Sequence, residues 1–313
     1  MTYVAGIDVG TGMTKAVVLA VNAASGEPRV IAKGSNRTGA HLEEAARSAL
    51  HAALDGAGLR ESDVTYIAST GFGRHAVGFR DIQITEITSG ARGAFFLFPE
   101  SGFVLDIGSQ TTRAIGLGEA GRVRNFKTNE KCAAGSGSFI IRAAKYLEVG
   151  IDDVGDLALK ALSPQPISSV CAVLAESEII NHVSSGVTVE NILRGIYDSL
   201  ADRSSLLLKR TRFSGDLVFI GGVARQRGMI AALEDRLHTR VNVPEDSEYV
   251  CALGAALLGL KRLETLPART TTDTGAASSE ANREGALAKA RPGVPLRRAF
   301  AAAGSGTDGS AAF

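Results

Sequence analysis

The sequence is poor in cysteine, has no excess of either charge and contains no long apolar run, and each shortage excludes a class of protein. Three cysteines in 313 residues are too few for a disulfide-stabilised scaffold, so a cysteine here is expected to be a packing residue or a ligand. The 34 basic and 33 acidic residues leave a formal charge of +1. Such a balance gives no electrostatic case for binding nucleic acid or an anionic membrane.

Signals for membranes and for secretion are missing as well. No stretch is long and apolar enough to span a bilayer, and residues 1–6 lack the basic and apolar regions of a secretion signal. Because 45% of the residues are hydrophobic, the chain can bury enough surface for two domains of ordinary size. We therefore expect a soluble, cytoplasmic, globular protein.

Two of the three cysteines open segments that resemble the beginnings of helices. Cys132 stands at the glycine-rich turn of residues 131–137, and Cys171 comes just before an apolar run. The positive end of a helix dipole stabilises a thiolate, which is the form of cysteine that ligates metal. A cubane iron–sulfur cluster takes about four thiolates. One chain offers two at these positions, so the pattern predicts a 4Fe-4S cluster completed by a second, similar chain.

A strand, a glycine turn and a second strand begin the chain. Residues 2–8 are β-rich, residues 9–15 form the turn, and residues 16–20 return as a strand. In a Rossmann or Walker loop the glycines lead into a helix, so this hairpin belongs to neither class. Its backbone N–H groups can still bind phosphate.

The same pattern recurs near residue 100. Residues 104–115 repeat the order of aspartate, glycine, hydroxyl, base and small apolar residue, with Asp106 in the place of Asp8. One aspartate–glycine hairpin is ordinary turn chemistry, but two in register favour a phosphate site. The repeat predicts two domains, 1–100 and 101–266, whose hairpins face each other across a nucleotide cleft.

The remaining patterns predict a mixed α/β fold. Apolar residues at helical spacing predict a helix over 41–54 that Gly56 closes, followed by a strand over 64–69. The further expected elements are a helix over 188–209, a strand over 216–220, the turn Gly221–Gly222, a helix over 226–237, a strand over 240–243 and a helix over 247–263. Residues 267–313 are rich in small and polar residues and are predicted to be a disordered tail.

Taken together, these motifs resemble the ATPase family shared by activators of 2-hydroxyacyl-CoA dehydratases and ATP-binding subunits of benzoyl-CoA reductase. The resemblance covers residues 3–263, and its motifs are residues 6–11, 70–74, 106–108, 131–137, 170–178 and 221–224. It implies an actin-like, sugar-kinase-like fold that binds MgATP between two domains. It also implies one 4Fe-4S cluster held across a dimer by Cys132 and Cys171 of each subunit.

The resemblance further implies roles for single residues. Asp8 and Asp106 would hold Mg²⁺ through water or orient the attacking water, and Gly221 and Gly222 would face the adenosine. The phosphate contacts would be Gly10, Thr11, Gly12, Thr14 and Lys15 in the first hairpin and Gly108, Ser109, Gln110 and Thr111 in the second.

Three positions have two interpretations or depart from the family pattern. Glu176, on the helix expected after Cys171, is either a link between nucleotide and cluster or a solvated carboxylate. Gly90 occupies a place where relatives often carry histidine, and no role is assigned to it. Cys251 stands where relatives tend to have a small residue, and we interpret it as a packing thiol.

Three functions stay open. The favoured one is the ATP-hydrolysing electron-transfer subunit of a benzoyl-CoA reductase, which passes electrons from ferredoxin to ring-reducing subunits and pairs with an identical or homologous ATPase. Residues 12–15 and 107–112 and the short chain suggest this subunit among the relatives. The alternative is a homodimeric activator of a 2-hydroxyacyl-CoA dehydratase. A sugar or acyl kinase with structural cysteines is disfavoured, because no substrate-reading loop stands out.

Overall fold

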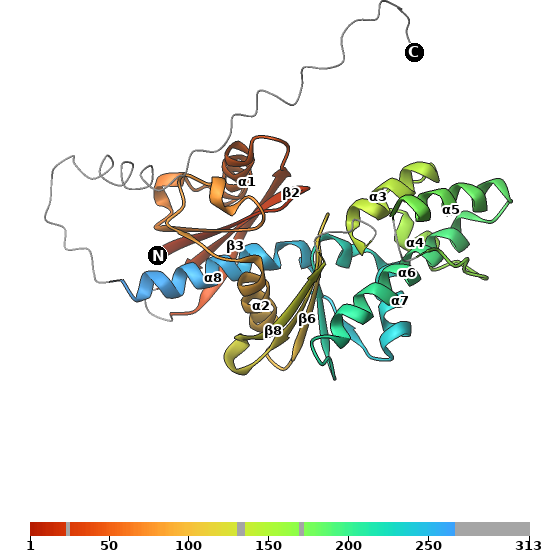
Figure 1. Ribbon diagram of the computed structural model, residues 1–313. Helices are drawn as coiled ribbons and strands as arrows, with labels where there is room; N and C mark the ends of the chain where they lie inside the picture. Colours follow the sequence, from red (N-terminus) through yellow and green to blue (C-terminus); the bar gives the residue numbers. More distant parts are fainter. Residues whose placement is uncertain (23–25, 130–134, 169–171, 267–313) are drawn as a thin grey trace, which may run out of the picture. The chain divides into compact units, whose positions relative to one another are not determined.

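The computed structural model describes residues 1–22, 26–129, 135–168 and 172–266 (Figure 1). Cys132 and Cys171 lie outside the described residues, and so does the tail of residues 267–313. Residues Met1–Leu266 form one compact unit that holds two five-stranded sheets.

The first sheet has the order β3-β2-β1-β4-β5. Its strands are β1 (Thr2–Val9), β2 (Met13–Val21), β3 (Pro28–Arg37), β4 (Tyr66–Thr70) and β5 (Ile82–Gln83). Strand β1 is antiparallel to β2 and parallel to β4. Alternate side chains of β1 and β2 pack against α1 (Leu42–Ala57), while Val17 and Leu19 face α8 (Val250–Glu264). Coverage on both faces explains why these strands read as continuous apolar runs.

The second sheet repeats this plan with the order β10-β9-β6-β7-β8. Its strands are β6 (Phe103–Ile107), β7 (Thr112–Leu117), β8 (Val123–Asn129), β9 (Leu217–Ile220) and β10 (Val241–Asn242). Strand β6 is antiparallel to β7 and parallel to β9, as β1 is to β2 and β4. Helix α2 (Glu86–Leu97) packs on one face of this sheet, and α6 (Val189–Lys209) is part of the core on the other.

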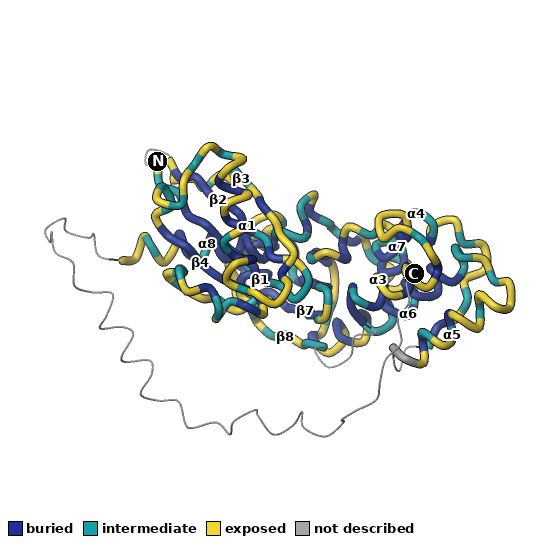
Figure 2. The backbone as a smooth tube through the Cα atoms, turned by 90° about the horizontal axis from the view of Figure 1, so that it is seen from above, coloured by how far each residue is buried: buried dark blue, intermediate teal, exposed yellow. Residues whose placement is uncertain are grey.

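Helices α2 and α8 cross between the two sheets at glycine contacts. A Cβ at Gly254 would lie 1.8 Å from the Ser89 carbonyl oxygen, and one at Gly93 would lie 2.2 Å from the Val250 carbonyl oxygen. Helix α2 precedes residue 100 yet packs on the second sheet, whereas α8 comes late in the chain and, beyond its first two residues, packs on the first sheet. The two cores are thus interleaved in sequence, and the division at residue 100 stays a prediction. Figure 2 shows how fully β1 and β2 are buried.

Most expected elements are present, with shifts at their ends. Helix α1 runs through Gly56, and Gly58 ends it by donating its N–H to the Asp55 carbonyl oxygen, so the predicted stop at Gly56 was wrong. Helix α6 begins after the N-cap Thr188, and α7 (Arg227–Leu237) follows the double glycine as expected. Helix α8 starts three residues late because Ser247–Tyr249 forms a 3₁₀ turn.

Strand β3 and helix α2 were not predicted, and the sequence explains why. Strand β3 lies at the edge of its sheet and has mostly exposed side chains, so its apolar alternation is weak. Helix α2 carries Gly90 and Gly93, which lower helix propensity by about 1 kcal/mol each relative to alanine. Contact with α8 requires the glycine at position 93. Packing against α8 therefore stabilises a helix that the local helix propensity disfavours.

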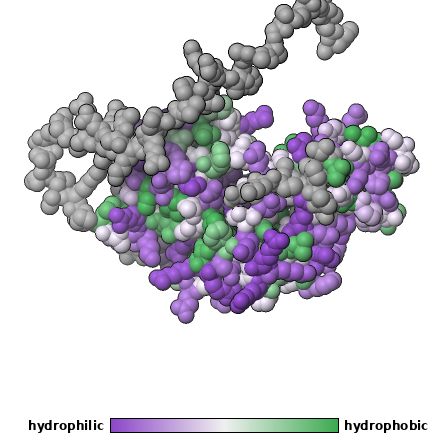
Figure 3. Space-filling model, in the orientation of Figure 1, coloured by the Kyte–Doolittle hydropathy of each residue, from purple (hydrophilic) through white to green (hydrophobic). Residues whose placement is uncertain are grey.

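The α-helices of the described residues also include α3 (Gly137–Tyr146), α4 (Val154–Ala158) and α5 (Ala172–Ser184). Among the described residues, no helix is long and apolar enough to cross a membrane. Hydrophilic and hydrophobic side chains are intermixed on the face drawn in Figure 3.

Candidate functional site

A cleft of about 1160 Å³ is lined by both glycine hairpins. Small-molecule sites typically measure about 300–1,000 Å³, so a nucleotide fits with room to spare. The predicted site residues that line it are Asp8, Gly10, Thr11, Gly12, Lys15, Asp106, Gly108, Ser109, Gln110, Thr111, Gly221 and Gly222. Thr14 differs, because its side chain is fully buried and its hydroxyl pairs with that of Thr38 at 3.0 Å. Its role as a phosphate contact stays a prediction that rests on the resemblance.

Each aspartate is paired with a base directly across its hairpin. Lys15 Nζ donates to Asp8 Oδ2 at 2.9 Å, and Arg113 Nη1 donates to Asp106 Oδ2 at 2.9 Å. Both pairs are register partners in their antiparallel strands. Sequence reasoning named Lys15 as a site residue but not Arg113. The repeat itself would have found it, because Arg113 stands where Lys15 stands in the first hairpin.

Burial and neighbouring charges together shift the pKa values of Lys15 and Asp106. Burial alone would lower the pKa of Lys15, but the Asp8 carboxylate outweighs it and holds that pKa above its usual value. Burial raises the pKa of Asp106, and the charge on Asp8 adds to this rise while Arg113 opposes it. The two aspartates therefore share one electrostatic field, in which a divalent cation would relieve their repulsion.

A glycine with positive φ lies against each aspartate. Gly71 follows β4 with φ +91°, and a Cβ there would lie 2.5 Å from Asp8 Oδ1. Gly221 follows β9 with φ +91°, and a Cβ there would lie 2.6 Å from Asp106 Oδ1. Any other residue would be strained at these positions and would crowd a carboxylate oxygen. The internal duplication thus extends to these turns, which sequence reasoning had not paired.

The donor set fits a magnesium ion that is delivered with a nucleotide. Carboxylate oxygens suit Mg²⁺, which usually keeps several waters and takes its remaining ligands from phosphates. In the described part of the chain, no three or more His, Cys, Asp or Glu side chains form a self-sufficient metal site. Asp8 and Asp106 would therefore hold the ion together with water and substrate oxygens.

A chain of charged side chains links the cleft walls. Arg113 Nη2 lies 3.3 Å from Glu86 Oε1, and Arg74 Nη1 lies 3.0 Å from Glu86 Oε2. Arg74 Nη1 also donates to the Gly71 carbonyl oxygen at 3.0 Å. The sequence indicates residues 70–74 as a family motif without a role, and no sequence signal marks Glu86. No local pattern brings these residues together, since they come from separate elements.

Cys251 lies in the cleft wall and within the apolar cluster of the second sheet. Its Sγ is 3.5 Å from the position that a Cβ at Gly90 would occupy. Burial raises the pKa of this thiol, and the charges of Asp106 and Asp8 raise it further. The thiolate is disfavoured, which agrees with its interpretation as a packing residue.

The second hairpin is hydrogen bonded to the start of α3. The N–H groups of Gly137 and Ser138 donate to the carbonyl oxygens of Gly108 and Ser109 at 2.9 and 2.8 Å. Thr112 Oγ1 donates to the Gly135 carbonyl oxygen at 2.5 Å. Cys132, which precedes Gly135 in the chain, and Cys171, which directly precedes α5, lie outside the described residues, so their ligand role stays a prediction.

Glu176 ties α5 to α3. Its Oε1 accepts from Arg142 Nε at 2.7 Å, and its Oε2 accepts from the Tyr146 hydroxyl at 3.2 Å. Neither alternative drawn from the sequence anticipated an ion pair between the two helices that follow the cysteines.

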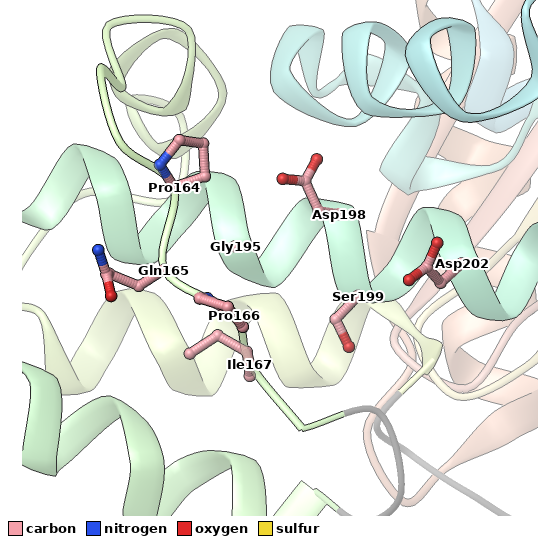
Figure 4. A pocket seen from close by; sticks show the side chains of 8 residues that line it. All are labelled: Pro164, Gln165, Pro166, Ile167, Gly195, Asp198, Ser199 and Asp202. Atoms are coloured by element: carbon pink, nitrogen blue, oxygen red, sulfur yellow. The ribbon is translucent and has the colours of Figure 1, made fainter.

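A second cavity of about 240 Å³ lies beside α6 (Figure 4). It is lined by Pro164, Gln165, Pro166, Ile167, Gly195, Asp198, Ser199 and Asp202. Asp198 pairs with Arg194 at 2.8 Å and Asp202 pairs with Arg236 at 2.5 Å. The acidic groups are thus already neutralised by bases of this chain, and no site is assigned here.

Comparison with known proteins yields a consistent set of relatives. The profile of the BadF/BadG/BcrA/BcrD ATPase family matches residues 5–259. A benzoyl-CoA reductase subunit of Thauera aromatica is 40% identical over 274 residues, with 85% of this chain and 96% of the relative covered. The activator of lactoyl-CoA dehydratase of Anaerotignum propionicum is 38% identical over 255 residues, with 82% and 96% covered.

A solved structure agrees with this result. The activator of 2-hydroxyisocaproyl-CoA dehydratase from Clostridium difficile, with bound ADPNP, superimposes with a TM-score of 0.78 at 34% identity, covering 84% of this chain and 96% of the other. The α/β fold is thus the actin-like ATPase fold that the sequence predicted, with its plan present twice.

Proposed function

This chain belongs to the BadF/BadG/BcrA/BcrD ATPase family, and on that premise we propose that it is the ATP-hydrolysing electron-transfer subunit of a benzoyl-CoA reductase complex. The observation that carries the ATPase half is the pair of aspartate hairpins lining one cleft. The electron-transfer half rests on Cys132 and Cys171 and on the relatives. Its partners would be an identical or homologous ATPase subunit, the substrate-reducing subunits and ferredoxin as donor.

In the proposed ATPase reaction, the two hairpins divide the phosphates between them. Backbone N–H groups of residues 10–12 and 108–111 would bind phosphate oxygens, since oriented amides form an anion site. Asp8 and Asp106 would hold Mg²⁺ and orient the attacking water. Lys15 and Arg113 fix the aspartates at 2.9 Å and balance their charge before substrate binds. Such preorganisation means that little rearrangement is needed when charge develops in the reaction.

The cysteine pair gives the proposal its electron-transfer step. Cys132 and Cys171 of two subunits would supply the four thiolates of a 4Fe-4S cluster, which provides a low-potential one-electron site when bound. An aromatic ring resists reduction because the first electron destroys its delocalisation, so ATP hydrolysis must supply energy beyond that of the donor. The second hairpin is hydrogen bonded to Gly135 and to the start of α3, and Gly135 follows Cys132 by three residues in the sequence, which supports a connection between the phosphates and the cluster.

A benzoyl-CoA reductase component and a dehydratase activator are related to this chain at similar identity. The identity is 40% to the Thauera aromatica reductase component and 38% to the lactoyl-CoA dehydratase activator, which leaves the activator as the second candidate. That alternative would be a homodimer that reduces a separate dehydratase in an ATP-dependent step.

An anaerobic assay of the complex purified from its native cell separates the two functions. With a reduced low-potential donor, dienoyl-CoA should form from benzoyl-CoA in the presence of ATP, and not without ATP or with a non-hydrolysable analogue. Ring reduction that proceeds equally well without hydrolysis would refute the coupling. ATP-dependent activation of a co-purifying 2-hydroxyacyl-CoA dehydratase would instead establish the second candidate.

A further inference from the structure

We propose that Glu86 is a positioning residue that joins the two aspartate hairpins into one magnesium- and phosphate-binding unit. The proposal rests on the ATPase reaction proposed for the cleft. Glu86 is the first residue of α2, and its side chain is 16% exposed. Each of its carboxylate oxygens is paired with a different arginine.

The position of Glu86 on its own helix is well defined. It follows the N-cap Thr85, whose hydroxyl accepts from the Thr88 N–H at 3.3 Å. A carboxylate in the first turn of a helix is stabilised by the helix dipole. Helix α2 is in turn packed between the second sheet and α8. Glu86 is therefore a fixed point from which both arginines can be oriented.

Toward the second hairpin, Glu86 acts through Arg113. The guanidinium group of Arg113 contacts Asp106 with one nitrogen and Glu86 with the other. An arginine side chain stays protonated in proteins, so Arg113 is a fixed positive charge shared between the two carboxylates. If the charge on Glu86 were removed, Arg113 would be drawn toward Asp106 alone. The carboxylate of Asp106 would then be less available to a metal ion.

Toward the first hairpin, Glu86 acts through Arg74. Arg74 bridges Glu86 and the Gly71 carbonyl oxygen, both at 3.0 Å. Gly71 lies directly against Asp8 Oδ1, and the N–H of Gly73 donates to the Val9 carbonyl oxygen at 2.9 Å. A shift of Arg74 would therefore move the loop that faces Asp8.

The charges alternate along this route from Asp106 through Arg113 and Glu86 to Arg74. In a partly buried chain of this kind, loss of one member leaves its neighbours without their counter-charge. A change at one hairpin is therefore transmitted to the other. Both aspartates serve the same MgATP, so the magnesium dependence of the reaction is the property that this linkage controls.

The test compares Glu86→Gln with the matched control Glu61→Gln in the full-length protein. Glu61 also bridges two basic side chains, Arg47 at 2.7 Å and His51 at 2.9 Å, but it does not line the cleft. Glu86→Gln should raise the Mg²⁺ concentration for half-maximal ATP hydrolysis by about tenfold, because glutamine removes the charge from both arginine contacts. Binding of metal-free ATP, measured by calorimetry, should change far less. Glu61→Gln should keep the magnesium dependence of the wild type.

Two results would overturn the proposal. One is a magnesium dependence of Glu86→Gln equal to that of Glu61→Gln when both variants are folded. The other is an equal loss of metal-free and magnesium-dependent binding, which would indicate a purely structural role. If Glu86→Gln does not fold, Arg74→Met decides the question, because methionine keeps a long unbranched side chain but can donate to neither Glu86 nor the Gly71 carbonyl oxygen. It should shift the magnesium dependence about threefold in the same direction, and an unchanged dependence would refute the linkage.

The proposed function can fail independently of this linkage. If the wild-type protein hydrolyses ATP with the expected magnesium dependence but supports neither ring reduction nor dehydratase activation, the proposed function is wrong and the role of Glu86 still stands. If the wild type shows no magnesium-dependent hydrolysis, both are wrong.

Discussion

The first hairpin, residues 8–15, and the second hairpin, residues 106–113, share one plan but are attached to different parts of the molecule. The first is held by Thr38, the residue that follows β3. The Thr38 N–H donates to the Gly12 carbonyl oxygen at 3.1 Å, and the Thr38 hydroxyl donates to the Gly10 carbonyl oxygen at 2.8 Å. The second is held by residues 135–138, at the start of α3. The two hairpins thus share the aspartate, the glycine turn and the base, but they are attached differently, the first to the segment after an edge strand and the second to the start of α3.

The basic side chains of the two hairpins also differ in the contacts that they make outside their own hairpin. Lys15 contacts Asp8 and the Met13 carbonyl oxygen, both within its own hairpin. Arg113 contacts Asp106 and also reaches Glu86 outside its hairpin. A planar guanidinium group can hold two carboxylates in fixed directions, which an ammonium group does less well. The base of the second hairpin therefore contacts Glu86 directly, whereas the first hairpin is connected to Glu86 only through Gly71 and Arg74.

The largest effect is expected when the aspartate of each hairpin is neutralised in turn, which tests whether the two hairpins have equivalent roles. Asp8→Asn and Asp106→Asn should each lower the rate of MgATP hydrolysis by at least about 100-fold, because each removes a charge that holds the metal or orients water. Phosphate release gives the rate, and circular dichroism verifies the fold. Unchanged turnover in either variant would remove that hairpin from the active site.

Replacing single cysteines tests which thiols ligate the cluster, and therefore whether the segment beside the second hairpin in the sequence supplies a ligand. Cys132→Ser or Cys171→Ser should lose the iron and brown colour of the anaerobically purified complex, since thiolate count limits assembly. Cys251→Ser should keep both, because Cys251 packs in the apolar wall of the cleft. Bleaching by Cys251→Ser alone would show that the ligands have been assigned wrongly.

Thr14 and Thr112 occupy equivalent places in the two hairpins and allow a matched comparison. Thr112→Val leaves the buried Gly135 carbonyl oxygen without the hydroxyl donor seen here and should cost about 1–3 kcal/mol of unfolding free energy. Thr14→Val should cost less, because Thr38 retains its bond to the Gly10 carbonyl oxygen. Urea unfolding measures both values. Equal losses would mean that the hydrogen bond from Thr112 to Gly135 stabilises the protein no more than the hydrogen bond between Thr14 and Thr38.

The smallest expected effect is on the reactivity of Cys251, whose pKa is raised by the charges of both aspartates. Its raised pKa keeps the thiol protonated, so alkylation at pH 8 should be slow and should accelerate as the pH approaches that pKa. Asp106→Asn should increase the rate more than Asp8→Asn, because Asp106 contributes more to the rise. Mass spectrometry of the labelled peptide gives the rates. The opposite order would reverse the electrostatic ranking of the two hairpins.

The sequence by itself determined the repeated hairpins and their aspartates, and its resemblance to an ATPase family implied the actin-like fold. The hairpins are local features, since a strand, a glycine turn and a second strand follow each other within about fifteen residues, and the repeat marks the pattern as significant. For the same reason, Asp8, Lys15 and Asp106 could be named before their pairing was known. The family resemblance rested on these same short motifs and is confirmed by the match over residues 5–259.

Only the tertiary structure decided how distant parts of the chain complete the cleft. Arg74, Glu86 and Arg113 belong to three separate elements, and their contacts depend on the packing of α2 between the second sheet and α8. No periodicity in the sequence encodes such a contact. The burial of Thr14 is also a tertiary fact, because it depends on its pairing with Thr38 of the neighbouring segment. Local patterns specify strands and turns, whereas long-range packing selects which polar side chains face the ligand and which support it from behind.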